Sequence, residues 1–293
     1  MAAIIIDGKA IGQKVREDAK QRTDTLRQKG IVPCLAVILV GDDPASVSYV
    51  TGKEKALAEA GMECRDTRLP ANVSETDVLT LIHKLNEDKK VHGILVQLPL
   101  PKQINEDRII TAIDPKKDVD GFHPVSVGNM LLGRPGFLPC TPHGVMVMLR
   151  EIKIPLSGSH AVVVGRSNIV GKPLANLLTR RDCNATVTVC HTGTKDLARY
   201  TLDADILIAA VGKPGLISSD MVKPGAAVID VGVNRAPDSS KKSGFRLCGD
   251  VDYGPVAEKA GFITPVPGGV GPMTIAMLMQ NTVIAAEVYG NGQ

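Results

Sequence analysis

Four polar side chains in the first half of the chain have the residue types and spacing for acid–base chemistry. Tyr49 and Lys53 lie four residues apart, so a helix over 45–60 would place them on one face. Gln97 ends an apolar run, and Asp120 follows further along the chain. A lysine acts as a base near neutral pH only when its pKa is lowered, and partial burial lowers it. We therefore expect Lys53 to act as the base, oriented by the neutral amide of Gln97.

Each of these residues also has a purely structural interpretation. A lysine on a helix is most often a solvated charge, and an aspartate directly before Gly121 is common in turns. As a functional group, Asp120 can accept two hydrogen bonds from a planar, amidine-like ring. Spacing alone leaves both interpretations of Lys53 and Asp120 open.

A strand, a glycine turn and a helix follow one another in residues 161–174. This order is typical of the first unit of a dinucleotide-binding fold, in which glycine lets the backbone approach a pyrophosphate and the helix N-terminus offers unpaired N–H groups. The usual G-x-G-x-x-G appears here as Gly165-x-Ser167-x-x-x-Gly171. Because this match is partial, a tight turn that binds no ligand is the alternative.

The end of the next predicted strand, residues 185–190, indicates the cofactor. NAD-binding folds carry an acidic residue about 20 positions after the glycine turn. The sequence here reads Cys190-His191-Thr192-Gly193-Thr194-Lys195, without Asp or Glu, and Arg166 lies in the first turn. Basic and hydroxyl side chains suit a 2′-phosphate and predict NADP, with an incidental polar turn as the alternative.

Alternating strands and helices must position these groups. The continuous apolar runs 34–40 and 91–97 suit strands buried on both faces of a parallel sheet. Further strands are expected over 4–6, 66–69, 161–164, 185–190, 205–211 and 226–231, and helices over 9–30, 45–60, 104–113, 143–152, 172–181 and 275–289. Another helix is expected to begin after its cap Ser74. The order predicts an α/β fold with functional residues at the carboxyl ends of its strands.

Segments rich in glycine and proline join these elements. Residues 264–274 hold three glycines and three prolines, which predicts a rigid substrate clamp before the last helix, with a linker as the alternative. Thr141 is expected to cap the helix over 143–152, which would link two domains. His123 and His143 are interpreted as structural residues, and 236–249 as a polar hairpin or loop.

Composition limits the class of protein. The 293 residues carry a net charge of +3 and only 3% aromatics, so we expect no nucleic-acid partner. Six cysteines show no C-x-x-C pair and no metal-ligand spacing, which favours reduced thiols, a cytoplasmic location and no metal site. No leader and no apolar run of membrane-spanning length is expected.

Six motifs together resemble one family, the bifunctional methylenetetrahydrofolate dehydrogenase/methenyltetrahydrofolate cyclohydrolases, in their stand-alone bacterial form. They occur in the family's order from about residue 6 to the C-terminal helix. The motifs are Tyr49-Val-x-x-Lys53-x-Lys55, Val96-Gln97-Leu98-Pro99-Leu100-Pro101, Lys117-Asp118-Val119-Asp120-Gly121, Pro139-Cys140-Thr141-Pro142, Gly165-Arg166-Ser167-x-x-Val170-Gly171-Lys172-Pro173 and Pro265-Val266-Pro267-Gly268-Gly269-Val270-Gly271-Pro272-Met273-Thr274.

The resemblance implies a fold and an activity. It implies a folate-binding catalytic domain from residues 1–147 and 270–293, and a Rossmann-type NADP-binding domain from 148–269. It implies oxidation of methylenetetrahydrofolate with NADP and hydrolysis of the methenyl product to formyltetrahydrofolate, a step of one-carbon metabolism that supports purine biosynthesis. A homodimer is implied as well.

The resemblance also implies roles for individual residues. Lys53 is the catalytic lysine, Tyr49 stacks on the folate, Gln97 tunes Lys53 and Asp120 grips the pterin. The remaining implied contacts are Gly268, Gly269 and Pro272 with the folate, and Gly165, Arg166, Ser167, Thr192 and Val233 with the nucleotide.

Two other classes of protein share parts of this pattern. A shikimate-type NADP-dependent dehydrogenase would have the same two-domain plan, and a non-catalytic NADP sensor would bind nucleotide without needing Lys53. One local feature departs from good helix design, because Gly52 beside Lys53 costs about 1 kcal/mol relative to Ala. It either loosens the lysine or makes room for a closely packed neighbour.

Overall fold

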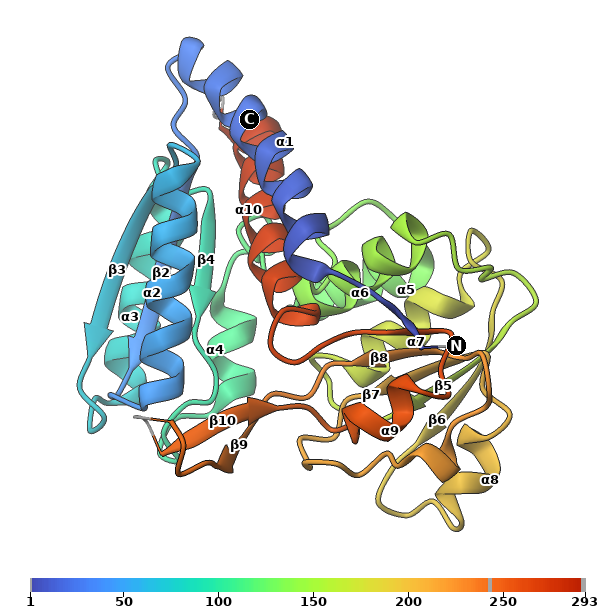
Figure 1. Ribbon diagram of the computed structural model, residues 1–293. Helices are drawn as coiled ribbons and strands as arrows, with labels where there is room; N and C mark the ends of the chain where they lie inside the picture. Colours follow the sequence, from blue (N-terminus) through green and yellow to red (C-terminus); the bar gives the residue numbers. More distant parts are fainter. Residues whose placement is uncertain (1, 242–243, 291–293) are drawn as a thin grey trace. The chain divides into compact units, whose positions relative to one another are not determined.

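The computed structural model describes residues 2–241 and 244–290. The chain divides into two compact units (Figure 1). Unit 1 comprises residues up to 12 together with 141–274, and unit 2 comprises 13–140 together with the residues from 275 onward. The chain passes between the units within three helices: α1 (Gly8–Gln28), α6 (Cys140–Glu151) and α10 (Val270–Tyr289).

Unit 2 is built on a parallel three-stranded sheet in the order β3-β2-β4. All seven residues of the central strand β2 (Cys34–Val40) are buried, as its continuous apolar run predicts. Its neighbours are β3 (Glu63–Leu69) and β4 (Gly93–Val96), and the helices are α2 (Pro44–Glu59), α3 (Glu75–Glu87), α4 (Glu106–Ala112) and α5 (Pro124–Leu132). The α/β prediction is confirmed for this half.

Side-chain caps begin the helices of unit 2. Asp43, Ser74 and Asn105 each accept a hydrogen bond from a backbone N–H in the first turn of α2, α3 and α4. Such caps satisfy N–H groups that the helix itself leaves unpaired. The cap of α2 matters for function because this helix carries Tyr49 and Lys53.

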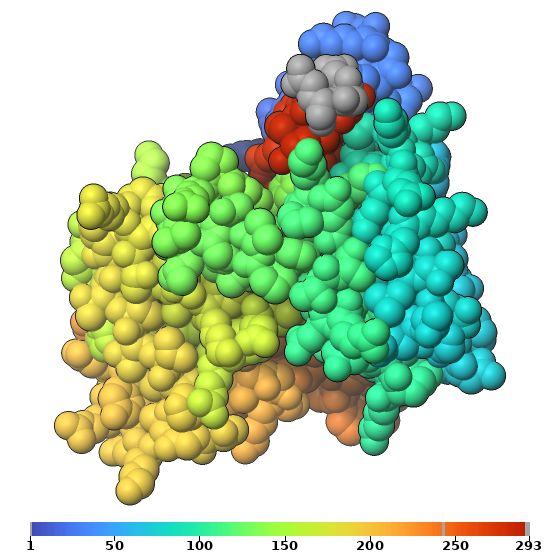
Figure 2. Space-filling view, turned by 180° about the vertical axis from the view of Figure 1, so that it is seen from behind, coloured from blue at the N-terminus to red at the C-terminus, as the bar shows by residue number. Residues whose placement is uncertain are grey.

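The parts of α1 and α10 that belong to unit 2 lie side by side. Figures 1 and 2 both show the later part of α1 (blue) next to the end of α10 (red). An ion pair joins the guanidinium of Arg22 to the carboxylate of Glu287, with N–O distances of 2.6 and 3.0 Å. The last helix of the chain therefore completes the unit that begins at residue 13.

Unit 1 is built on a parallel six-stranded sheet in the order β1-β11-β8-β7-β5-β6. The strands are β1 (Ile4–Ile5), β5 (His160–Val164), β6 (Thr186–Cys190), β7 (Ile206–Ala209), β8 (Ala227–Asp230) and β11 (Phe262–Ile263). The helices are α7 (Gly171–Thr179), α8 (Leu197–Thr201), α9 (Tyr253–Ala257) and the 3₁₀ helix η1 (Ser219–Met221), and the hairpin is β9 (Asn234–Pro237) with β10 (Phe245–Cys248). The hairpin falls in the segment predicted as hairpin or loop.

The division differs from the predicted boundaries at the start of the chain. Residues 2–12 were expected in the first domain, but β1 pairs in parallel with β11, which places them in unit 1. The other two boundaries, at 140/141 and 274/275, lie several residues from the predicted 147/148 and 269/270. A two-residue strand carries no sequence signal for its pairing partner, because pairing depends on tertiary contacts.

Several local predictions need correction. Thr141 is not an N-cap, because α6 already begins at Cys140. Helix α10 begins at Val270, so Pro272 lies in its first turn instead of in a preceding loop. The sequence analysis missed α5, α8 and α9. His123 caps α5, since its Nδ1 accepts a hydrogen bond from Val125 N at 3.0 Å.

Candidate active site and nucleotide site

Lys53 and Gln97 come together in unit 2. Lys53 lies on α2, and Gln97 follows directly on β4, at the carboxyl end of the sheet. Nζ of Lys53 donates to Oε1 of Gln97 at 3.0 Å, and Nε2 of Gln97 donates to the carbonyl of Leu98 at 2.7 Å. Because the carbonyl of Leu98 binds the NH₂ group of the Gln97 amide, the amide oxygen of Gln97 faces Lys53. An amide oxygen accepts from either a charged or a neutral amine, so this contact holds Lys53 in both protonation states.

Burial disfavours the ionised forms of Lys53 and Asp120. Burial lowers the pKa of Lys53, while the negative charge of Asp120 opposes that shift. Burial also raises the pKa of Asp120, and the positive charge of Lys53 and the thiol of Cys140 oppose it. Removal from water is the larger effect for both groups. Lys53 therefore gives up its proton more readily than a lysine in water, and Asp120 takes up a proton more readily than an aspartate in water.

The backbone that carries Asp120 is fixed from two sides. Nδ2 of Asn281 donates to the carbonyls of Val119 at 2.8 Å and Leu138 at 3.2 Å, and Sγ of Cys140 donates to Val119 O at 3.3 Å. Sequence reasoning missed Asn281 and took Cys140 for a core thiol. Asn281 lies between Gln280 and Thr282 on α10, so the sequence did not single it out.

The neighbouring carboxylate of Asp118 is structural. It is buried and accepts hydrogen bonds from Phe122 N at 3.2 Å and His123 N at 2.9 Å. Burial raises its pKa to about 6, against the effect of these bonds. Asp118 thus shapes the turn that precedes α5, whereas Asp120 has Lys53 as its charged neighbour.

Tyr49 lies one helical turn before Lys53 on α2, and 47% of its surface is exposed. An aromatic ring in this position is free to stack on a flat ligand. The departure from good helix design at Gly52 has a mild explanation. A Cβ at this position would meet Ile275 Cδ1 at 3.8 Å, an ordinary van der Waals contact, so the packing does not require glycine.

The glycine turn of unit 1 requires its two glycines. Gly165 has a φ of +124°, and a Cβ there would lie 2.1 Å from the carbonyl oxygen of Ala210. A Cβ on Gly171 would lie 2.1 Å from the carbonyl oxygen of Gly165. Side chains are therefore excluded where β5 turns into α7, as a dinucleotide-binding turn demands.

The N-terminus of α7 differs from the expectation of unpaired N–H groups. Oγ of Ser167 accepts from Val170 N at 3.1 Å and Gly171 N at 3.3 Å, and the carbonyl of Ser167 accepts from Lys172 N at 3.1 Å. Local hydrogen bonds thus occupy the N–H groups that a phosphate would use. This leaves the exposed side chain of Arg166 as the cationic group of the turn.

The other predicted nucleotide contacts lie at the same edge of the sheet. Val164 at the end of β5 pairs with Cys190 at the end of β6, so Arg166 and Thr192 follow neighbouring strands by two residues each. Val233 follows β8 and is 46% exposed. The glycine turn, the basic side chain and the absence of an acidic residue after β6 are all compatible with a nucleotide that carries a 2′-phosphate.

Two buried aspartates, missed by the sequence analysis, hold the loops after β7 and β8. The carboxylate of Asp250 accepts from Val211 N at 2.7 Å, Gly212 N at 2.9 Å and Asn234 Nδ2 at 2.8 Å. Asp230 lies behind it, and its Oδ1 accepts from Asp250 N at 2.9 Å.

Asp230 also accepts from Gly232 N at 3.0 Å and Val251 N at 2.9 Å, and burial raises its pKa to about 6. A Cβ on Gly249 would lie 1.8 Å from Asp230 Oδ2, so the carboxylate is packed against backbone. The sequence signal for Asp230 was that it adjoins an apolar run, and Asp250 had no such signal. We call Asp230 and Asp250 the aspartate clamp.

The remaining predicted site residues are Gly268, Gly269 and Pro272. They belong to unit 1, whereas Lys53 belongs to unit 2. Gly268 has a φ of +110°, and a Cβ on Gly269 would lie 2.6 Å from the carbonyl oxygen of Pro265. A Cβ on Gly8 would in turn lie 1.8 Å from the carbonyl oxygen of Gly269, so the loop packs closely against the start of α1. Pro272 follows in the first turn of α10. Among the described residues, no cluster of His, Cys, Asp or Glu could hold a metal ion.

The fold and these residues define a two-unit α/β protein with a dinucleotide-type sheet in one unit and a lysine-centred site in the other. Comparison with known proteins gives the family. The catalytic-domain model of tetrahydrofolate dehydrogenase/cyclohydrolase matches residues 6–120, and its NAD(P)-binding-domain model matches residues 139–289. The chain belongs to the tetrahydrofolate dehydrogenase/cyclohydrolase family.

Individual relatives agree over nearly the whole chain. The bifunctional protein FolD of Syntrophus aciditrophicus is 57% identical over 290 residues, which cover 98% of this chain and 99% of that protein. A crystal structure of the Campylobacter jejuni FolD methylenetetrahydrofolate dehydrogenase/cyclohydrolase is 52% identical, with a TM-score of 0.93 over 98% of this chain and 99% of that one.

A third relative was solved with a cofactor. The Trypanosoma brucei enzyme, complexed with NADP and an inhibitor, is 39% identical, with a TM-score of 0.94 over 98% of both chains. None of the described helices of the present chain is long and apolar enough to cross a membrane.

Proposed function

We propose that this protein oxidises methylenetetrahydrofolate with NADP and hydrolyses the resulting methenyltetrahydrofolate to formyltetrahydrofolate. The observation that carries the proposal is the contact between Lys53 Nζ and Gln97 Oε1, beside Asp120, in a chain of this family. A shikimate-type dehydrogenase or an NADP sensor has no use for this arrangement.

In the oxidation step, the residues of the chain align two rings. Bound NADP supplies the acceptor for the hydride that leaves the methylene carbon of the substrate. Gly165, Arg166, Ser167, Thr192 and Val233 would hold the nucleotide, with Arg166 at the 2′-phosphate. The lone pair of the adjacent folate nitrogen stabilises the cation that forms, so the protein needs to supply orientation more than acid or base.

The folate itself would be held by the residues that the family resemblance implies. Tyr49 offers an exposed ring for stacking, and Asp120 offers two oxygens to the planar N–H donors of the pterin. Gly268, Gly269 and Pro272 would line the site of the substrate. A charged Asp120 accepts both hydrogen bonds, so the neighbouring positive charge of Lys53 supports binding by opposing the rise in the pKa of Asp120.

The hydrolytic step requires proton transfer. Water attacks the methenyl carbon: its oxygen bonds to that carbon, the electron pair of the C=N bond returns to nitrogen, and one proton passes to Nζ of Lys53. The adduct then becomes the formyl group when one C–N bond breaks, the departing nitrogen takes the proton back from Lys53, and the hydroxyl proton is released to solvent. Burial lowers the pKa of Lys53, which increases the fraction of neutral amine able to take this proton near neutral pH. Gln97 accepts a hydrogen from the amine before and after the transfer, so Lys53 keeps its position.

The assembly and location follow from the family resemblance. We propose a homodimer in the cytoplasm, with folate as the small-molecule partner and no nucleic-acid or membrane partner. The six cysteines are all free thiols, which supports a reducing compartment.

Product analysis tests the proposal. The pure protein is mixed with methylenetetrahydrofolate and NADP, and NADPH and the folate products are measured together. NADPH with formyltetrahydrofolate, formed faster than methenyltetrahydrofolate hydrolyses unaided, is the expected result. Accumulation of methenyltetrahydrofolate would show a dehydrogenase alone and remove the role of Lys53. Absence of NADPH would contradict the whole assignment.

A further inference from the structure

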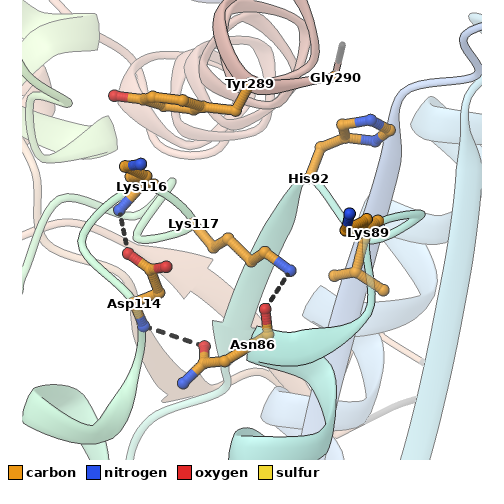
Figure 3. A pocket seen from close by; sticks show the side chains of 9 residues that line it. Asn86, Lys89, His92, Asp114, Lys116, Lys117, Tyr289 and Gly290 are labelled. Atoms are coloured by element: carbon orange, nitrogen blue, oxygen red, sulfur yellow. Dashed lines mark hydrogen bonds between the residues drawn. The ribbon is translucent and has the colours of Figure 1, made fainter. Parts of the chain in front are cut away.

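A cavity lies in unit 2, outside the candidate active site (Figure 3). Its volume is about 410 Å³. His92 precedes β4 and Gln97 follows it, so five residues of extended chain, about 16 Å, separate the cavity from the Lys53–Gln97 pair. The lining residues used below are Asn86, Lys89, His92, Asp114, Lys116 and Tyr289.

Hydrogen bonds fix the wall of this cavity before any ligand arrives. Nζ of Lys117 donates to three backbone carbonyls at the end of α3, at 2.8–2.9 Å. The side-chain oxygen of Asn86 accepts from Asp114 N at 3.0 Å, which joins α3 to the segment after α4 (Figure 3). A preformed wall lowers the entropy lost on binding.

The cavity has an excess of positive charge. The carbonyl partners of Lys117 carry no net charge, so its ammonium is not neutralised by them. The ammonium of Lys116 lies 5.4 Å from the ring centre of Tyr289, and Lys89 has no ion-pair partner in the part of the chain that is described. Asp114 is the sole carboxylate among the described lining residues. Three lysines and one aspartate thus line the cavity.

His92 adds a neutral donor. Its Nδ1 accepts a hydrogen bond from Cys34 N at 3.1 Å, so the neutral ring carries its hydrogen on Nε2. No described residue accepts that hydrogen, and Nε2 is not among the enclosed polar atoms that lack a partner. A second, smaller cavity shares His92, Lys89 and Gly290, so this donor group borders both.

We propose that this cavity binds small phosphate monoesters. Lys116 lies on one side of the cavity and Lys89 and His92 on the other (Figure 3). A phosphate group offers several oxygens in different directions, whereas a carboxylate offers two in one plane. The volume exceeds that of the phosphate group alone, and the ring of Tyr289 supplies a flat surface for the organic part of the ligand (Figure 3). The proposal is independent of the folate activity.

Calorimetric titration of the full-length protein with inorganic phosphate and with phenyl phosphate tests it. The wild type is compared with the double variant Lys89→Ala/Lys116→Ala, in which phosphate binding at the nucleotide site of unit 1 remains. We expect one class of binding sites to weaken at least tenfold in the double variant. Phenyl phosphate should bind this class more tightly than inorganic phosphate because of the ring of Tyr289.

The matched control is Lys102→Ala, which removes a lysine of the same unit that does not line the cavity. It should bind both anions as the wild type does. Dehydrogenase activity should be unchanged in all variants, which would show that the fold is intact. Identical titrations for the wild type and the double variant, or no saturable binding beyond the nucleotide site, would overturn the proposal. Binding of inorganic phosphate without binding of phenyl phosphate would restrict the site to free phosphate and contradict the monoester assignment.

Discussion

Buried charges serve two different ends in the two units of this molecule. In unit 2, the ammonium of Lys53 has one neutral hydrogen-bond partner, Gln97, among the described residues. In unit 1, the carboxylate of Asp250 accepts three hydrogen bonds, two of them from backbone N–H groups. All these groups lose water, but the aspartates regain several hydrogen bonds from the protein, whereas Lys53 regains one.

The difference distinguishes a group that transfers protons from a group that holds the backbone in place. A charged group whose hydrogen bonds are satisfied by the backbone positions that backbone, and a change in its protonation would disrupt the fold. A group with a single neutral partner can change its protonation without disturbing its neighbours. The number and type of hydrogen-bond partners therefore distinguishes Lys53 from Asp250 better than burial does.

The most severe test of this distinction is Lys53→Gln. If Lys53 takes the proton of the attacking water, cyclohydrolase kcat should fall by about 10²–10⁴-fold. The melting temperature should change little, because Lys53 supports no backbone. The matched control is Lys55→Gln, two residues along α2, where the side chain is 79% exposed. Full cyclohydrolase activity in Lys53→Gln would contradict the proposed role.

The pH profile of the wild type adds to this test. Cyclohydrolase activity requires neutral Lys53, so it should rise with pH through the pKa of that group. Because burial lowers this pKa, the midpoint should lie below the ordinary lysine value of 10.5. Removing the charge of Asp120 should move the midpoint lower still, since that charge raises the pKa of Lys53.

Asp120→Ala tests the other half of the pair. We expect a higher KM for folate and loss of most turnover in both steps, because two hydrogen bonds to the pterin disappear. Steady-state kinetics with both substrates measure this. The comparison variant is Asp118→Asn, which should lower stability instead, since Asp118 accepts backbone bonds from Phe122 and His123. Unchanged folate binding in Asp120→Ala would exclude the pterin contact.

Asp250→Ala should show the opposite pattern to Lys53→Gln. Loss of the acceptor leaves Val211 N and Gly212 N unpaired, which should reduce the free energy of unfolding by about 3 kcal/mol. The KM for NADP should rise, whereas hydrolysis of added methenyltetrahydrofolate should persist below the melting temperature. Urea unfolding and steady-state kinetics measure the two effects.

A charge swap provides the control for this variant. In Asp250→Asn/Asn234→Asp, the amide at 250 still accepts the backbone bonds, and it can donate to the carboxylate at 234, so the contact now seen at 2.8 Å is restored. Stability should recover in large part. Failure to recover would show that the position of the charge matters, and not only the hydrogen bonds.

The smallest expected effect concerns His143, a buried group with neither role. Among the described residues, its Nδ1 has no hydrogen-bond partner, and burial lowers its pKa from 6.5 to about 4. The unfolded chain therefore takes up a proton first, and stability should fall as the pH drops from about 6.5 to 4.

His143→Leu should remove this part of the pH dependence. Urea unfolding of both proteins between pH 7 and 4 measures the difference. The raised pKa values of Asp118 and Asp230, each about 6, act in the opposite direction, but they are common to both proteins and cancel in the comparison. A constant difference across this pH range would contradict the assignment.

The sequence predicted the regular part of the fold because apolar periodicity reports burial directly. The seven-residue run that forms β2 and the turn at Gly165 came out as expected. The contact of Lys53 with Gln97 was anticipated as well, because Gln97 directly follows an apolar run and its neutral amide suits a lysine of lowered pKa.

Features that depend on long-range pairing were not predictable. The pairing of β1 with β11 joins residues about 260 positions apart, and two residues carry no signal for it. Asn281 and Asp250 each act through backbone atoms that are distant in sequence. The occupied N–H groups of α7 depend on the rotamer of Ser167, which a motif does not specify.

Each unit combines segments that are far apart in the sequence: unit 1 contains residues up to 12, and unit 2 contains the residues from 275 onward. This division has a consequence for biosynthesis. On the ribosome, β2, β3 and β4 emerge early, but the backbone that carries Asp120 receives its hydrogen bonds from Asn281 only when the last helix appears. In the same way, β1 waits for β11. Unit 2 therefore reaches its final structure only after α10 has been synthesised, and the sheet of unit 1 only after β11 has.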